Sequence, residues 1–254
     1  MADVLAIIIH YVFLIGFSIG FYLIRNRKAK DILLKTVAVL CFFMHISIFW
    51  VNSLMGKNTV VNPTSSLIWP IAFCNVVMYL LLVVAFLPKE SFWFRAIGCF
   101  VIFGGFFGTL GNIIGTSGYV ANYSNFKGFL SHGLMTLGAL MLLVGYIKPR
   151  AKDAIYVAMG FLLCGFIGIT INLIFMFGID SSVDAMWFRS GFVKRGGVFT
   201  TSWAMGIYII LFSFVFGILN DARYNLGIRK EGATKCQTQQ NKHKLEQQKN
   251  TKRN

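Results

Sequence analysis

The 254-residue chain is 56% hydrophobic and only 13% charged, with 26 Phe and four Pro, and its mean hydropathy is +0.67. Soluble globular proteins carry about 25% charged residues because their surface must be hydrated. The composition therefore excludes soluble enzyme folds and predicts an all-α, polytopic membrane protein. The formal net charge of +15 does not indicate nucleic-acid binding, because most Lys and Arg lie in short gaps between apolar runs or after residue 220.

Seven apolar segments are long enough to form spanning helices, which need about 20 residues each. In chain order they are residues 4–24, 32–52, 67–87, 92–116, 129–147, 153–178 and 198–220. They predict a seven-helix transmembrane domain over residues 1–220. Residues 221–254 are basic and rich in Gln, Lys and Asn, which predicts a disordered cytoplasmic tail. The five cysteines have no metal-finger spacing, and we expect no cofactor.

The distribution of Lys and Arg predicts the orientation of these helices. Ten of them lie in or beside the first, third and fifth connections, and five lie on the opposite side. The five are Lys57, Lys127, Arg189, Lys194 and Arg195. Because positive residues concentrate in cytoplasmic loops, the N-terminus is expected outside and the C-terminus in the cytoplasm.

Polar residues inside the predicted spans gather in one layer. At 1.5 Å per residue, they lie roughly 5–12 Å below the outer surface. The members of this layer are His10, His45, Cys74, Asn75, Asn112, His132 and Asn172. Polar groups are costly within a bilayer, so the layer predicts a polar cavity open to the outer leaflet. Hydrogen bonds between neighbouring helices are the alternative explanation. Glycines such as Gly104, Gly105 and Gly108 indicate close helix packing beside it.

Two short segments carry a family resemblance. The run Trp69-Pro70-Ile71-Ala72-Phe73-Cys74-Asn75 resembles the Pro-Leu-His-x-Cys signature in the third helix of YwaF-type bacterial integral membrane proteins. Ser131-His132-Gly133 resembles that family's helix with a His shortly after its outer end. The signature His before the cysteine is replaced here, because positions 72 and 73 are Ala and Phe.

The resemblance implies a function in lipid metabolism at the cell membrane. YwaF-type proteins are similar to an animal membrane acyltransferase that acts on ether phospholipids and, distantly, to the androgen-induced lipid hydrolases. In the acyltransferase a Cys is the nucleophile and a His its base, which would make Cys74 and His132 the catalytic pair. His45, Asn75, Asn112 and Asn172 would orient the substrate or bind its developing oxyanion. The partners would be the lipid bilayer and a lipid substrate.

Two other functions remain open. A non-enzymatic permease or ligand-binding membrane protein would use the same polar layer without a nucleophile. A zinc site made by His10, His45, His132 and Cys74 has suitable residue types, although its four members come from four helices without an i, i+4 pair.

The predicted orientation can be tested by cysteine-accessibility labelling of intact cells. Cysteines introduced at Ser53 and Ser182 should react from outside, and residues 235–254 should not, because the positive-inside bias places the tail in the cytoplasm. Labelling of the tail but not of the two loops would reverse the orientation and move the polar layer to the cytoplasmic leaflet.

Overall fold

The computed structural model describes residues 2–47, 50–51, 70, 72–115, 123–178, 184–187 and 203–224. Within these residues the protein forms seven long α-helices and no β-strand, which confirms the all-α prediction. The helices are α1 (Ala2–Leu23), α2 (Arg27–Ile46), α4 (Phe73–Phe86), α5 (Phe92–Gly115), α6 (Tyr123–Gly145), α7 (Ala154–Gly178) and a last helix, Trp203–Tyr224. Two short 3-10 turns, η1 (Ala151–Asp153) and η2 (Ala185–Trp187), flank α7.

Three segments are long and apolar enough to cross a membrane. They are Phe126–Gly145, Ala151–Phe175 and Trp203–Tyr224. Large aliphatic and aromatic side chains are exposed along α1, α7 and the last helix, which suits contact with lipid rather than water. These features support the prediction of a membrane protein. Each of the seven predicted segments overlaps one of the described helices.

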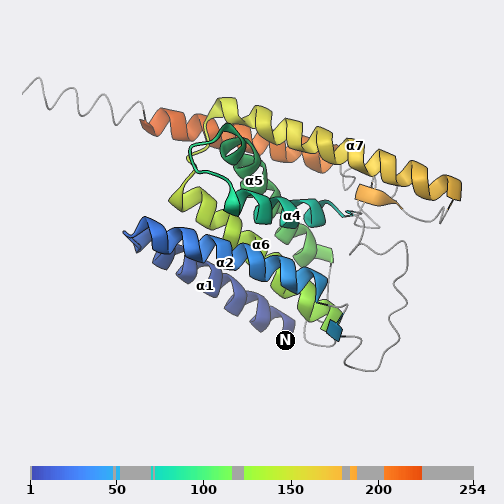
Figure 1. Ribbon diagram of the computed structural model, residues 1–254, viewed down its shortest axis with the longest axis horizontal. Helices are drawn as coiled ribbons and strands as arrows, with labels where there is room; N and C mark the ends of the chain where they lie inside the picture. The colour runs from blue at the N-terminus through green and yellow to red at the C-terminus, as the bar shows by residue number, and fades with distance from the viewer. Residues whose placement is uncertain are drawn as a thin grey trace, which may run out of the picture.

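Helix α6 is the centre of the bundle. It packs against α1, α2, α4 and α5, and α5 in turn packs against α7. In Figure 1, α1 and α2 lie along one side of the molecule, α7 and the last helix lie along the other, and α4, α5 and α6 lie between them. Fully buried Leu34, Val77, Leu81, Met135 and Leu142 form part of the core between these helices.

Glycines on α5 allow α4 and α6 to approach closely, as the sequence predicts. A Cβ atom at Gly104 would lie 3.1 Å from the ring of Phe73 on α4. At Gly105 it would lie 3.0 Å from the Cβ of Ala139 on α6. Gly108 has neighbours on both helices. This side of α5 therefore fixes the spacing of the two helices that carry Cys74 and His132.

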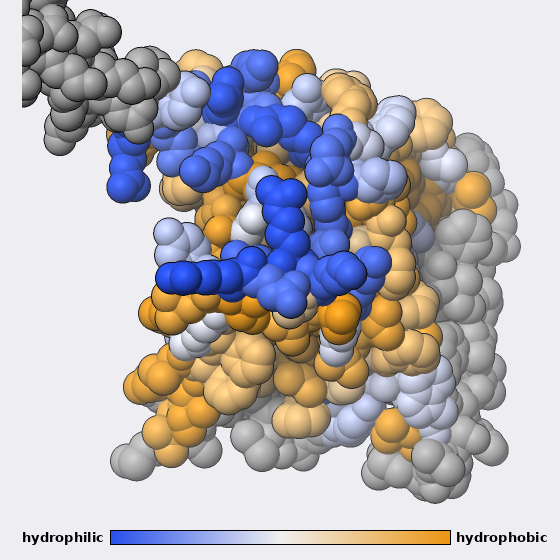
Figure 2. Space-filling view, turned by 60° about the vertical axis from the view of Figure 1, so that its left-hand side comes forward, coloured by the Kyte–Doolittle hydropathy of each residue, from blue (hydrophilic) through white to orange (hydrophobic). Residues whose placement is uncertain are grey.

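The first, third and fifth connections meet at one end of the bundle, where the last helix also ends (Figure 1). With that end turned toward the viewer, hydrophilic residues gather over one part of the visible face, and much of the rest is hydrophobic (Figure 2). Asp31 of α2 accepts a hydrogen bond from the Tyr146 hydroxyl at 2.8 Å and lies 3.7 Å from the Lys89 ammonium. Partial burial lowers the pKa of Lys89, and the Asp31 carboxylate opposes that shift.

A buried carboxylate ties α5 to the start of α7. Asp153, with a side chain only 1% exposed, accepts a hydrogen bond from Arg95 Nε at 3.0 Å and pairs with the same guanidinium through its second oxygen. That second oxygen also accepts from the backbone N–H of Arg150 at 2.7 Å. The buried negative charge of Asp153 is thus stabilised both by the Arg95 guanidinium on α5 and by the backbone N–H of Arg150.

The last helix is attached to the same connection by polar side chains. Asp221 accepts from the backbone N–H of Ala151 at 3.1 Å, and Asn220 donates to the carbonyl of Pro149 at 3.0 Å. Gly217 lies directly against the backbone of Arg150 and Ala151, so no side chain fits there without a shift.

Several helix boundaries differ from the predicted spans. α4 begins at Phe73 rather than at residue 67, because the backbone of Ala72 is still extended (φ −100°, ψ 144°). α6 begins at Tyr123 rather than at residue 129, because its polar first turns bond to α2. The last helix continues to Tyr224, past the predicted domain end at residue 220. The predicted tail beyond Tyr224 lies outside the described residues.

Replacement of Arg95 by Gln should destabilise the bundle by about 2–4 kcal/mol, because it leaves the buried Asp153 carboxylate without its charged partner. Unfolding of the detergent-purified variant, followed by circular dichroism, measures the loss. Lys152→Gln in the same connection removes one exposed charge and is the control. Equal stability of Arg95→Gln and the control would show that the ion pair contributes little.

Candidate functional site

Cys74 lies on the first turn of α4. Its helix is only 14 residues long, and Cys74 is the second of them, whereas the predicted span from residue 67 would make it the eighth. The first N–H groups of an α-helix have no partner within the helix, and the N-cap residue Ala72 has no polar side chain to bond them. The positive end of the α4 dipole therefore lies beside the Cys74 thiol, where it favours a thiolate.

The Cys74 side chain lies where α4, α5 and α6 meet. Its Sγ donates to Asn75 Oδ1 at 3.6 Å, and Asn75 is buried. A Cβ atom at Gly108 of α5 would lie 3.7 Å from Cys74 Cβ and 2.9 Å from Met135 Cε. Met135 follows His132 by three residues, so both side chains lie on the same face of α6. Through Met135, that face of α6 approaches Cys74 at Gly108.

His132 is held in one tautomer by its own helix. Its Nδ1 lies 2.7 Å from the carbonyl oxygen of Gly128, one turn earlier on α6. A carbonyl only accepts hydrogen bonds, so Nδ1 carries the proton and donates it. The lone pair of the neutral ring is then on Nε2, and this nitrogen can act as a base.

His45 of α2 is the most deeply buried histidine of the predicted layer. It is 4% exposed, and within the part of the chain that the structure describes its Nε2 has no hydrogen-bond partner. The ring lies edge-on to Tyr79 of α4, with centroids 5.7 Å apart. Its backbone carbonyl accepts a hydrogen bond from Lys127 Nζ at 3.1 Å.

Lys127 is a member of the site that sequence reasoning missed. It was assigned to a connection, but it lies near the start of α6 with its ammonium half-buried against α2. Its charge acts electrostatically on Cys74, His45 and His132. Three groups of the layer, from α2, α4 and α6, therefore lie within reach of the Lys127 charge.

A periodic signal for this contact was present in the sequence. Tyr123, Lys127 and Ser131 are four residues apart, so they share one helical face. Tyr123 donates to Ser47 Oγ at 2.6 Å, and the carbonyl of Ser131 accepts from Cys41 Sγ at 3.4 Å. With the Lys127 bond, this face makes three polar contacts with α2.

The other predicted residues have separate surroundings. Asn172 on α7 makes two hydrogen bonds with the backbone of Ala185, at 2.7 and 3.2 Å. His10 of α1 packs its ring directly over Gly133 and lies 4.4 Å from the ring of Phe129. Asn112 belongs to α5, but its side chain is outside the described set.

The zinc alternative is not supported. Across the described ranges, no three His, Cys, Asp or Glu side chains are close enough together to hold a metal ion. Those ranges include all four residues of the alternative, namely His10, His45, Cys74 and His132.

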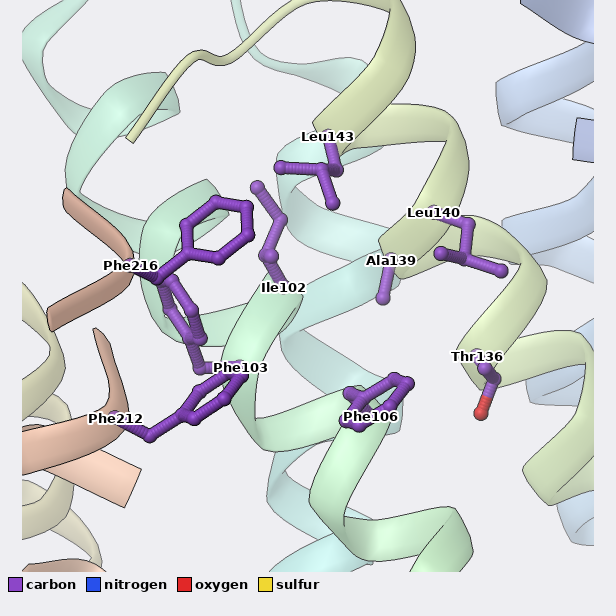
Figure 3. Close-up of a pocket in the computed structure, with 9 residues that line it drawn as sticks. All are labelled: Ile102, Phe103, Phe106, Thr136, Ala139, Leu140, Leu143, Phe212 and Phe216. Carbon is purple, nitrogen blue, oxygen red and sulfur yellow. The ribbon is translucent and has the colours of Figure 1, made fainter. Parts of the chain in front are cut away.

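Two apolar cavities lie beside the bundle core. One, of about 140 Å³, lies between α5, α6 and the last helix, with phenylalanine rings of α5 and the last helix facing each other (Figure 3). Its only polar lining group, the Thr136 hydroxyl, donates to the carbonyl of Gly105. The other, of about 250 Å³, lies between α7 and the last helix and is bordered by Phe73, the neighbour of Cys74.

Comparison of the chain with known protein families, with curated proteins and with solved structures finds no match. The function is therefore inferred from the residues of the site and from their geometry.

Cys74 should be the most reactive of the four described cysteines. It is partly exposed on a helix N-terminus, whereas Cys41, Cys99 and Cys164 are buried. In a Cys236→Ser background, which removes the remaining thiol, N-ethylmaleimide should modify Cys74 at least about tenfold faster than the others. Peptide mass spectrometry over a time course measures the rates. Faster modification of any buried cysteine would contradict the environment described for Cys74.

Proposed function

We propose that the protein is an integral membrane protein that crosses the bilayer with seven helices and acts on a lipid acyl group through Cys74 and His132, as the resemblance to the YwaF type implies. The observation that carries the proposal is the place of Cys74 on the first turn of α4, where it meets Met135 of α6 at Gly108, one turn along α6 from His132. The N-terminus is then outside, and the site faces the outer leaflet.

The first chemical step is formation of a thioester. His132 Nε2 takes the thiol proton, and the Cys74 sulfur attacks the carbonyl carbon of a lipid ester. The new C–S bond forms as the ester C–O bond breaks, and the protonated His132 returns the proton to the departing alcohol. The helix N-terminus and the Lys127 ammonium stabilise the negative sulfur before the attack.

The second step transfers the acyl group. A lysolipid hydroxyl or water gives its proton to His132 and attacks the thioester, so that a C–O bond forms and the C–S bond breaks. The protonated His132 then returns the proton to the departing Cys74 sulfur. The first backbone N–H groups of α4, together with the amide of Asn75, are donors for the oxyanion that develops in both steps. The products are a new ester or a free fatty acid and the original thiol.

The apolar cavity bordered by Phe73 supports a lipid as the substrate. Phe73 stacks on Phe161 of α7 with ring centroids 4.8 Å apart, and the cavity continues between α7 and the last helix. An acyl chain in this cavity would bring its carbonyl end toward the neighbouring Cys74.

A non-enzymatic ligand-binding protein or permease is the second candidate. It is favoured by the buried Nε2 of His45, which lacks a hydrogen-bond partner among the described residues. A buried nitrogen without a hydrogen-bond partner destabilises the protein unless a ligand bonds to it. A protein that only binds such a ligand would need no nucleophile.

Labelling by an alkyne-tagged 2-bromo fatty acid tests the enzymatic proposal. Cys74→Ala should abolish labelling of the protein in a Cys236→Ser background, and His132→Ala should slow it by about 10²- to 10⁴-fold, because the histidine activates the thiol. In-gel fluorescence after attachment of a dye measures the extent.

Two matched variants control for general effects on packing. Cys99→Ala removes a buried thiol that does not line the Phe73 cavity, and His10→Ala removes a histidine of the same layer that packs on Gly133. Both should label as the parent does. Equal labelling of His132→Ala and the parent would leave the binding protein as the better account.

A further inference from the structure

Among the described residues, the Lys127 ammonium has no carboxylate partner. Its one hydrogen bond within the described ranges goes to the backbone carbonyl of His45, at 3.1 Å. The ion pairs of that same part of the chain, Lys89–Asp31 and Arg95–Asp153, both lie at the other end of the bundle. An ammonium has three donors, so two remain for a ligand.

The imidazole of His45 is a second polar group with an unused hydrogen-bonding position, and it belongs to the residue that Lys127 contacts. The ring belongs to the residue whose carbonyl holds Lys127, and it is more than nine-tenths buried with Nε2 unpartnered among the described groups. A neutral imidazole can donate one hydrogen bond through this nitrogen. A buried donor of this kind indicates a missing acceptor.

The charge of the surroundings determines what that acceptor is. Lys127 and the positive end of the α4 dipole both favour an anion. A phosphate group offers several acceptor oxygens in different directions, whereas the two oxygens of a carboxylate lie in one plane. His45 of α2 contacts both Lys127 of α6 and Tyr79 of α4, so residues of three helices border the place, which suits a tetrahedral anion.

We propose that Lys127 and His45 form a phosphate-binding site at the end of the bundle opposite the Asp31 and Asp153 ion pairs, with Lys127 Nζ and His45 Nε2 as donors. The phosphate comes either from a lipid headgroup or from solution. The site goes beyond the acyl-transfer proposal, because binding does not require Cys74 to react.

Binding by the purified full-length protein in a neutral detergent tests the site. The probes are dihexanoyl phosphatidic acid, dihexanoylglycerol with the same chains but no phosphate, and inorganic phosphate. Isothermal titration calorimetry gives each Kd. We expect phosphatidic acid to bind at least about tenfold more tightly than dihexanoylglycerol, because a hydrogen bond to a charged group contributes about 1.5–3 kcal/mol.

Variants assign that binding to the two donors. Lys127→Gln should weaken binding of the phosphate probe at least about tenfold, while Lys127→Arg keeps the charge and should stay within about threefold. His45→Gln, which preserves the carbonyl that holds Lys127, should weaken it about fivefold. Lys152→Gln, at the opposite end of the bundle, should bind as the parent does. If Lys127→Gln does not fold, the Kd of His45→Gln for the phosphate probe tests the site by itself.

Each outcome has a defined meaning. Tight binding of phosphatidic acid alone identifies a lipid headgroup, and tight binding of inorganic phosphate identifies a free anion. The proposed site is supported if Lys127→Gln or His45→Gln loses the binding of phosphatidic acid or of inorganic phosphate. Equal binding of phosphatidic acid and dihexanoylglycerol, or binding that neither substitution changes, overturns it. Phosphate binding that survives in a protein without Cys74 labelling would separate this site from the acyl-transfer proposal.

Discussion

The contact between α2 and α6 determines the arrangement of the candidate site. One face of α6 carries Tyr123, Lys127 and Ser131, and each of them bonds to α2. Partial burial removes water from the Lys127 ammonium, which costs free energy. The single hydrogen bond to the backbone carbonyl of His45 offsets only part of this desolvation cost. The remaining positive potential is available to stabilise an anion, whether a thiolate, an oxyanion or a phosphate. His132 lies one turn further along α6 and is oriented by Gly128.

The short helix α4 is the second constraint. Its 14 residues extend about 21 Å, less than the roughly 30 Å of a hydrocarbon core. Phe73 and Cys74 at its N-terminus lie against α5 at Gly104 and Gly108, where Met135 of α6 is also close. Broken helices that direct their N-termini toward a polar site are one way in which membrane proteins bind anionic groups. The glycine face of α5 permits this arrangement, because Gly104 and Gly108 leave room for Phe73 and Cys74.

Apolar runs and charge counts in the sequence were sufficient to predict the helices and the meeting of three basic connections at one end. The seven spans and their orientation remain predictions. The start of α4 could not be predicted, because Ala72 and Phe73 continue an apolar run and the extended backbone at Ala72 depends on its surroundings. Lys127 was missed because a charge next to an apolar run is normally assigned to a loop. The grouping of Cys74, His45 and His132 depends on helix rotation, which the weak periodicity of all-apolar helices does not encode.

The central claim is that the side chains of Cys74 and His132 face each other. Its most direct test is cross-linking by dibromobimane, which becomes fluorescent only when it joins two neighbouring thiols. The test protein carries Cys74 and His132→Cys as its only thiols, and the control carries Leu130→Cys instead, on a different face of α6. The account predicts strong fluorescence for His132→Cys and little for Leu130→Cys. Equal fluorescence of the two, or none with His132→Cys, would contradict it.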